Sequence, residues 1–183
     1  MVKIDEERFD RLQREMETDN LDVLVCRLPE NVTYLTDYWP QQGLSVAVLA
    51  RGEEPVLLAP EVEAPYAKES WADTRIFGWG LVGEEDLFTS LSKLLSEVRD
   101  SMSLQNARVG IETSFELVAP PYNVMEPVGI GNPTRKLIEE TFSGGELVDA
   151  TDTLENARSV KTEYEHEKLR IANEIAALGL ARF

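Results

Sequence analysis

The sequence has little of two side chains on which much metal and hydrolytic chemistry depends. It contains one cysteine, Cys26, and one histidine, His166, among 183 residues. A single cysteine excludes an intramolecular disulfide and any multi-cysteine zinc site, and a single histidine excludes paired-histidine zinc motifs. Any Ser-His-Asp triad would depend on His166 alone. We expect Cys26 to be a small core residue.

Positive charge is also scarce. Lys plus Arg number 18 against 34 Asp plus Glu, which gives a formal net charge of -16. A field of this sign repels nucleic acid and anionic membranes, so we expect neither as a partner. Charged residues rather than an apolar run follow Met1, which predicts no secretory signal or membrane span and a cytoplasmic location. A hydrophobic content of 43% nevertheless supplies enough buriable surface for a folded domain.

The carboxylates are spread along the chain instead of forming one acidic tail. This pattern is typical of salt-adapted, halophilic proteins, because carboxylates repel one another strongly when little salt screens them. We therefore predict that the melting temperature rises markedly between low and molar salt. Thermal unfolding followed by circular dichroism across a salt series checks this, and a flat response would contradict it.

Helix-like and strand-like segments alternate along the sequence. Apolar spacing predicts helices over residues 6–18, 29–35, 61–70, 84–102, 132–142, 151–158 and 161–183, and strands over 21–26, 44–50, 55–59, 74–77, 108–112 and 147–149. Asn132 before Pro133 predicts a capped helix start. Residues 51–54 are short enough for a hairpin. The pattern predicts an α/β fold, a mixed sheet covered by helices.

Several short motifs are typical of nucleotide binding or metal-dependent catalysis, but the neighbouring residues do not have the charge that these functions need. Residues 78–83 match G-x-G-x-x-G, yet the acidic residues 84–86 that follow would repel a pyrophosphate, so a flexible connection is preferred. Asp22, Glu112 and Asp149 suggest a metal-dependent nuclease, yet no basic groove accompanies them. His166 lies between two glutamates and is expected on a solvated helix face.

A carboxylate and two aromatic side chains precede the second predicted strand. Tyr34 and Leu35 are expected in the core, whereas Asp37, Tyr38 and Trp39 can line a cleft. Aromatic rings contact a proline face well, and a carboxylate pairs with an ammonium group. Ordinary loop anchoring is the alternative, because aromatic side chains bury large areas wherever they lie.

Four segments together resemble the N-terminal part of the creatinase/prolidase/Xaa-Pro aminopeptidase family. They are Leu21-Asp-Val-Leu-Val-Cys26, the run from Pro29 to Tyr38, the paired strands at 44–59, and the stretch from Ala157 to Ala172. The resemblance spans essentially the whole chain, and the order and spacing of the segments agree with the family. Asp37 stands where the family pattern commonly has glycine.

The resemblance implies a three-layer α/β/α domain with a ribonuclease-H-like mixed sheet over residues 1–155, and a connecting helix over 156–183. It implies that this helix leads into a pita-bread catalytic domain, absent from this sequence, that holds two divalent metal ions, manganese, cobalt or zinc. The family's metal ligands all belong to that domain, so no residue of this sequence is assigned as a metal ligand or as catalytic. Asp37, Tyr38 and Trp39 are the substrate-side residues that the resemblance suggests.

Three interpretations of the whole protein follow from the resemblance. The first is the non-catalytic N-terminal domain of a dinuclear metallopeptidase that acts on proline-containing peptides, with a homodimer and its own C-terminal domain as partners. The second is a free-standing binding or dimerisation module. The third is the N-terminal domain of a creatinase-like amidinohydrolase.

Overall fold

The computed structural model describes residues 4–41, 44–78, 85–113, 115 and 129–182. Its centre is a six-stranded sheet in the order β4-β3-β2-β1-β5-β6. β2 pairs antiparallel with β1 and β3, and the other neighbours pair parallel, so the sheet is mixed, as predicted. The strands are β1 (Val23–Cys26), β2 (Val46–Ala50), β3 (Val56–Pro60), β4 (Asp73–Phe77), β5 (Arg108–Ile111) and β6 (Glu146–Asp149).

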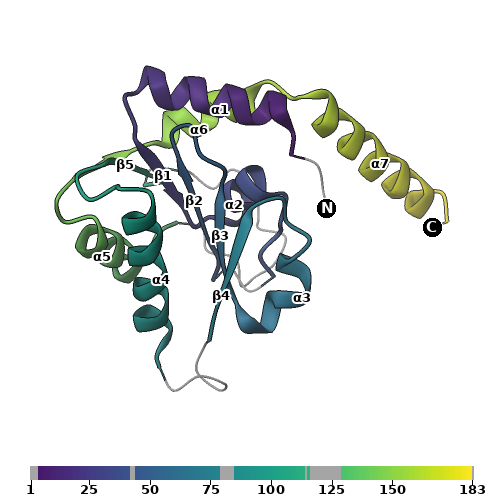
Figure 1. Cartoon of the computed structure of the whole chain (residues 1–183). Coiled ribbons are helices and arrows are strands. Elements are labelled where there is room, and N and C mark those ends of the chain that lie inside the picture. The colour runs from purple at the N-terminus through teal and green to yellow at the C-terminus, as the bar shows by residue number, and fades with distance from the viewer. Residues whose placement is uncertain (1–3, 42–43, 79–84, 114, 116–128, 183) are drawn as a thin grey trace.

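Helices cover both faces of the sheet (Figure 1). α4 (Leu87–Ser101) and α5 (Asn132–Thr141) pack on one face. The other face is covered by α1 (Glu6–Thr18), α2 (Pro29–Thr36), α3 (Ala64–Ala67) and α6 (Thr151–Ser159). This arrangement confirms the predicted α/β/α fold class.

Both faces of β1 are buried, which explains the continuous apolar sequence of this strand. Val23 and Val25 pack on the side of α4 and α5, whereas Leu24 and Cys26 pack on the side of α1 and α6. Cys26 is fully buried, as expected. β1, β5 and β6 run parallel, so their carboxyl ends meet at one edge of the sheet, where α2 and α6 begin.

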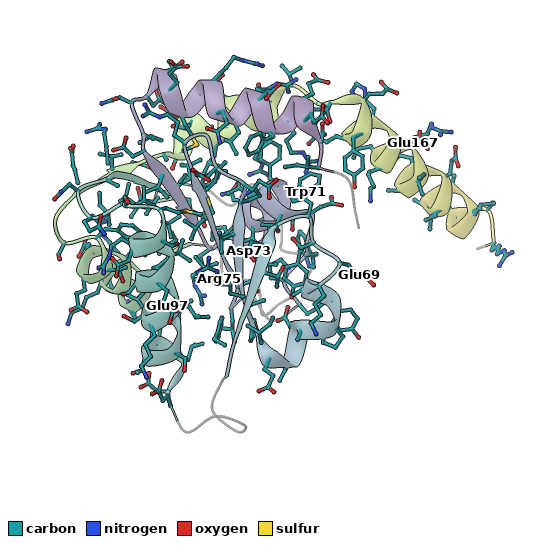
Figure 2. The ribbon with its side chains drawn as sticks, in the orientation of Figure 1. Glu69, Trp71, Asp73, Arg75, Glu97 and Glu167 are labelled. Atoms are coloured by element: carbon teal, nitrogen blue, oxygen red, sulfur yellow. The ribbon has the colours of Figure 1, made fainter. Side chains whose placement is uncertain are left out.

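The last helix, α7 (Glu163–Leu180), leaves the body of the domain (Figure 1). A capping box at Thr162 and Glu165 starts it, since each side chain accepts a hydrogen bond from the other residue's backbone N–H. None of its residues is buried, and Figure 2 shows Glu167 pointing away from the body of the domain, although Tyr164 and Glu165 of the first turn contact that body. Ile175 and Leu178 are about two-thirds exposed. The predicted connecting-helix boundary at residue 156 lies within α6.

One local prediction was wrong, and another was right only in part. The residue that caps α5 is Gly131, and Asn132 is already inside the helix, because Pro133 occupies its second position. The predicted helix at 61–70 is a 3-10 turn (Glu61–Glu63) followed by the short α3. Most of the glycine motif at 78–83 and of the predicted loop at 114–131 lies outside the described residues. Within the described residues, every helix is too short or too polar to cross a membrane.

Candidate functional site

A groove of about 410 Å³ lies between α2 and the start of α7. Glu30, Thr33 and Asp37 line it from α2, and Tyr164 and Lys168 line it from α7. Its volume falls within the range of roughly 300–1,000 Å³ typical of small-molecule pockets. The groove joins the compact domain to the projecting helix, so a ligand there would contact both.

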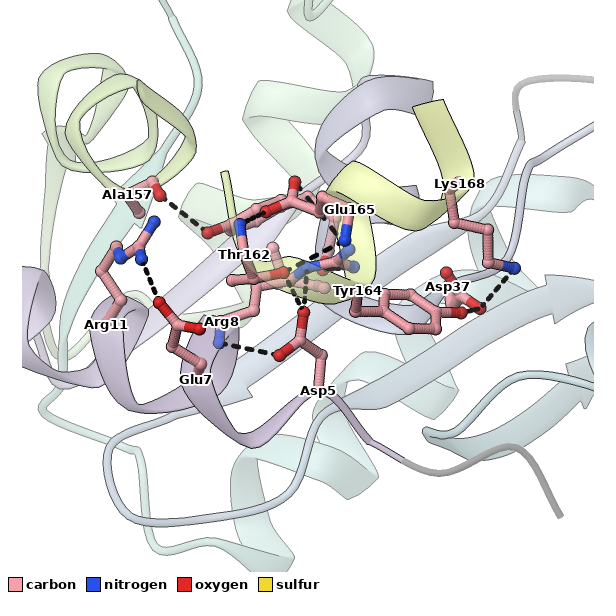
Figure 3. Close-up of polar contacts among 12 residues, drawn as sticks. Asp5, Glu7, Arg8, Arg11, Asp37, Ala157, Thr162, Tyr164, Glu165 and Lys168 are labelled. Carbon is pink, nitrogen blue, oxygen red and sulfur yellow. Dashed lines mark hydrogen bonds and ion pairs between the residues drawn. The ribbon is translucent and has the colours of Figure 1, made fainter. Parts of the chain in front are cut away.

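Asp37 ends α2 with its backbone in the left-handed region, at φ 55° and ψ 17°. This conformation costs a residue with a side chain about 1–2 kcal/mol, whereas glycine adopts it freely. The Asp37 carboxylate accepts a hydrogen bond from the Tyr164 hydroxyl at 2.6 Å and lies 3.9 Å from the Lys168 ammonium (Figure 3). Burial and then this bond raise the pKa of Tyr164. Asp37 therefore ties α2 to α7.

The structure separates the other two predicted substrate-side residues. Trp39 lines the groove beside Asp37. Tyr38 is buried in the core instead, and its hydroxyl donates a hydrogen bond to the carboxylate of buried Glu63. The same carboxylate accepts the Gln41 backbone N–H at 2.9 Å. We call the turn at residues 37–41, which carries Asp37 and Trp39, the corner of the groove. Tyr38 supports this corner from the side of the core.

Two substitutions of Asp37 distinguish the energetic cost of its left-handed backbone from the contribution of its side-chain contacts. Asp37→Ala and Asp37→Gly both remove the carboxylate, but only glycine is unstrained at this φ. We expect the alanine variant to be less stable than the glycine variant by about 1 kcal/mol. Urea unfolding of both variants measures the difference. Equal stabilities, or a more stable alanine variant, would contradict the structure at this position.

Sequence reasoning missed a buried cation that lines the groove. Arg8 of α1 is only 6% exposed, and its guanidinium lies 5.0 Å from the ring centres of Tyr34 and Trp71 and 5.5 Å from that of Tyr164. It donates to the Tyr34 carbonyl at 3.1 Å. Trp71, labelled in Figure 2, donates to the Leu35 carbonyl at 2.6 Å. Arg8 therefore joins α1, α2 and α7 through aromatic faces.

Two carboxylates complete this polar-aromatic cluster. The Arg8 guanidinium lies 3.7 Å from Asp5 and 3.9 Å from Glu165 (Figure 3). The Thr162 hydroxyl, which caps α7, donates to Asp5 at 2.5 Å. A sequence signal was present, because Arg8 lies four residues before Leu12, on the buried stripe of α1.

A second buried polar group lies at the start of α2. Glu112, 1% exposed, follows β5, and one of its carboxylate oxygens accepts the backbone N–H groups of Arg27 and Leu28. The other oxygen accepts from the Asn31 amide at 2.7 Å. Burial raises the pKa of Glu112 to about 7, although its hydrogen bonds oppose the rise. The amide oxygen of Asn31 accepts in turn from Arg158, at 2.8 Å.

The three carboxylates considered as a nuclease cluster have separate structural roles. Asp22 accepts the Arg108 backbone N–H at 2.8 Å, and Asp149 accepts that of Thr151 at 3.1 Å. Glu112 accepts the backbone N–H groups of Arg27 and Leu28, just before α2. His166 is exposed, 3.7 Å from Glu163. In the part of the chain that the structure describes, no three His, Cys, Asp or Glu side chains come together to hold a metal ion. These residues do not fit a dinuclear metal centre.

The fold and the sequence place the chain in a known family. The Creatinase/Prolidase N-terminal domain profile matches residues 8–160, so the chain belongs to this family. Its fold is similar to that of the prolidases from Pyrococcus horikoshii OT3 and Pyrococcus furiosus, both with a TM-score of 0.62, at 20% and 21% identity. The similarity covers 96% and 94% of this chain, but 41% and 44% of those chains. The chain therefore spans less than half the length of these prolidases.

A third solved structure is nearly coextensive with this domain. The Xaa-Pro aminopeptidase from Streptococcus thermophilus matches with a TM-score of 0.55 and 16% identity, over 84% of this chain and 97% of that chain. No curated protein matches the chain in sequence.

Proposed function

We propose that this chain is the non-catalytic N-terminal domain of a longer metal-dependent peptidase that cleaves Xaa-Pro bonds. The observation that carries the proposal is the family match over residues 8–160, together with the coverage of less than half of two prolidases. The exposed apolar side chains of α7 support it, because Ile171, Ile175 and Leu178 lie at helical spacing without a covering surface among the described residues. A C-terminal catalytic domain is the partner that we propose for this helix.

The groove is the part of this domain that we propose to face the substrate. Trp39 offers an aromatic face suited to a proline ring, and Glu30 and Asp37 offer carboxylates. Asp37 is already engaged by Tyr164 and Lys168, so we assign it the role of holding the corner in place, with Trp39 as the contacting side chain. Tyr38 acts behind them through Glu63.

The dinuclear centre belongs to the catalytic domain in this proposal. Manganese, cobalt or zinc would activate water there, while the residues of this chain bind, orient and enclose the peptide. The homodimer and the cytoplasmic location predicted from the sequence are parts of the same proposal.

Hydrolysis assays test the division of labour. The 183-residue chain with added manganese is expected to leave an Xaa-Pro dipeptide intact, whereas the product of a longer reading frame is expected to cleave it and to lose activity with chelator. Chelator-sensitive cleavage by the 183-residue chain would overturn the proposal. Cleavage of creatine, and not of Xaa-Pro peptides, by the longer product would favour the amidinohydrolase alternative.

The second candidate is a free-standing binding or dimerisation module. It is favoured by the Streptococcus thermophilus structure, whose solved chain is 97% covered by this one domain. The reading frame after Phe183 separates the two candidates. A continuing frame with two Asp, one His and two Glu at ligand positions supports the peptidase domain, whereas a stop codon supports the module.

A further inference from the structure

The buried carboxylate of Glu112 is connected to the groove by a chain of two hydrogen bonds. Its second oxygen accepts from the Asn31 Nδ2 amide at 2.7 Å, and Asn31 Oδ1 accepts from the Arg158 guanidinium at 2.8 Å. Asn31 is completely buried, whereas Arg158 lines the groove. A change in the charge of Glu112 can therefore affect Arg158 in the groove through one side chain, the amide of Asn31.

The direction of each hydrogen bond is fixed by chemistry. Arg158 has only donors, so it requires the oxygen of Asn31 to face it. The NH2 group of Asn31 must then face Glu112, which suits an ionised carboxylate that only accepts. The pair Glu112 and Arg158 is thus a charge pair with an amide between its members.

A proton on Glu112 is incompatible with this arrangement. One carboxylate oxygen faces the backbone N–H groups of Arg27 and Leu28, which are fixed donors at the start of α2. The remaining oxygen faces the Asn31 NH2 group, which is also a donor. The Cys26 thiol also hydrogen-bonds to Glu112, but its sulfur is only a weak acceptor. A protonated Glu112 therefore gains a strong acceptor only if the Asn31 amide turns over, and the Asn31 NH2 group then faces the donors of Arg158.

We propose that protonation of Glu112 turns the Asn31 amide over and releases the Arg158 guanidinium into the groove. One proton from solvent binds Glu112 Oε2, which then donates to Asn31 Oδ1, and the bond from Arg158 to Asn31 breaks. Glu112 and Asn31 are positioning residues for Arg158, whose guanidinium is bonded to Asn31 at high pH and, at low pH, leaves Asn31 but keeps its contact with the Phe115 ring. We call the hydrogen-bonded chain of Glu112, Asn31 and Arg158 the relay. Its use to regulate substrate binding rests on the proposed function, whereas its response to protonation does not.

The surroundings of Glu112 favour a titration near neutral pH. Burial raises its pKa to about 7, against the opposing effect of its hydrogen bonds. The Cys26 thiol beside it stays protonated, since burial and Glu112 raise its pKa. Among the described residues, the charged and titratable groups on neighbouring elements include Cys26 of β1 and Arg27 of the β1–α2 connection. They also include Glu30 of α2 and Arg158 of α6, which line the groove, and Asp149 of β6, which accepts the Thr151 N–H at the start of α6.

Nuclear magnetic resonance of the 183-residue chain tests the relay without any activity assay. Between pH 5.5 and 8.5 we expect the Glu112 carboxyl carbon, the Asn31 Nδ2 amide and the Arg158 guanidinium to shift with one common midpoint. Asn31 or Arg158 signals that stay constant, or that titrate with midpoints differing from that of Glu112, would overturn the proposal.

Two variants sharpen the test. Glu112→Gln carries a donor in place of the second oxygen, so Asn31 and Arg158 are expected to show their low-pH signals throughout. Glu63→Gln is the matched control, because Glu63 is also a buried carboxylate but bonds to Tyr38 and Gln41; it is expected to keep the wild-type titration. An Arg158 signal that still changes with pH in Glu112→Gln as in wild type, or one that no longer changes with pH in Glu63→Gln, would refute the relay. If Glu112→Gln does not fold, the pH series of the wild-type chain is sufficient to support or refute the relay.

The relay and the proposed function fail in different experiments. If a longer product does not cleave Xaa-Pro peptides but the three signals share a midpoint, the relay stands and the peptidase assignment falls. If cleavage is found and the signals do not move together, the assignment stands and the relay falls.

Discussion

Replacing Arg8 with alanine is expected to lower the free energy of unfolding by about 3 kcal/mol, because it leaves two poorly exposed carboxylates without their cation. The side chains of Asp5 and Glu165 are 6% and 15% exposed. The variant also removes the cation from between the rings of Tyr34, Trp71 and Tyr164. For a domain of this size the melting temperature should fall by roughly 6–12 °C.

Arg14→Ala is the matched control for Arg8→Ala. Arg14 lies on the same helix and is exposed, so its removal is expected to change stability by no more than about 0.5 kcal/mol. Calorimetry compares the two variants, and hydrogen exchange at residues 162–166 reports whether the start of α7 opens. Indistinguishable melting temperatures for the two variants would show that the cluster does not stabilise the domain.

The second large effect is a fall in stability with rising pH that comes from Glu112. Its pKa is about 7 in the folded chain, against a usual value of 4.5. Between these values the unfolded chain has released a proton that the folded chain still holds, so stability is highest below pH 4.5 and decreases as the pH rises through 7. The full change amounts to about 3 kcal/mol.

Glu112→Gln isolates this contribution from the general repulsion of an acidic chain. The glutamine does not titrate, so the difference in unfolding free energy between wild type and variant should change by about 3 kcal/mol from pH 4.5 to 7.5. Denaturant unfolding at a series of pH values, at constant salt, measures it. A difference that stays constant with pH would mean that Glu112 remains ionised in the folded protein throughout this range.

The order of the elements was predictable because each segment carries its own periodicity. The run from Val23 to Cys26 is a buried strand by composition, and Leu91, Leu95 and Val98 lie at helical spacing. The cap of α5 was misplaced because Asn132 and Gly131 both precede Pro133, and local chemistry does not separate them.

The corner of the groove was predictable, but its supports were not. Asp37 and Trp39 stood out as a carboxylate and an aromatic side chain before a strand. Asn31 meets Glu112 across 81 residues and Arg158 across 127, and no local pattern reports such pairings. Arg8 was overlooked because arginine is usually exposed, although its spacing from Leu12 placed it on the buried stripe.

The deep burial of Cys26 makes the chain convenient for measuring where α7 points. Its thiol is inaccessible and held protonated, since burial raises its pKa, so alkylating reagents have no reactive native target. A cysteine introduced at exposed Leu178 would then be labelled without reaction at the native thiol. A spin label there, paired with one on a second introduced cysteine in α4, would give the distance distribution between α7 and the body of the domain, and thereby the angular freedom of α7.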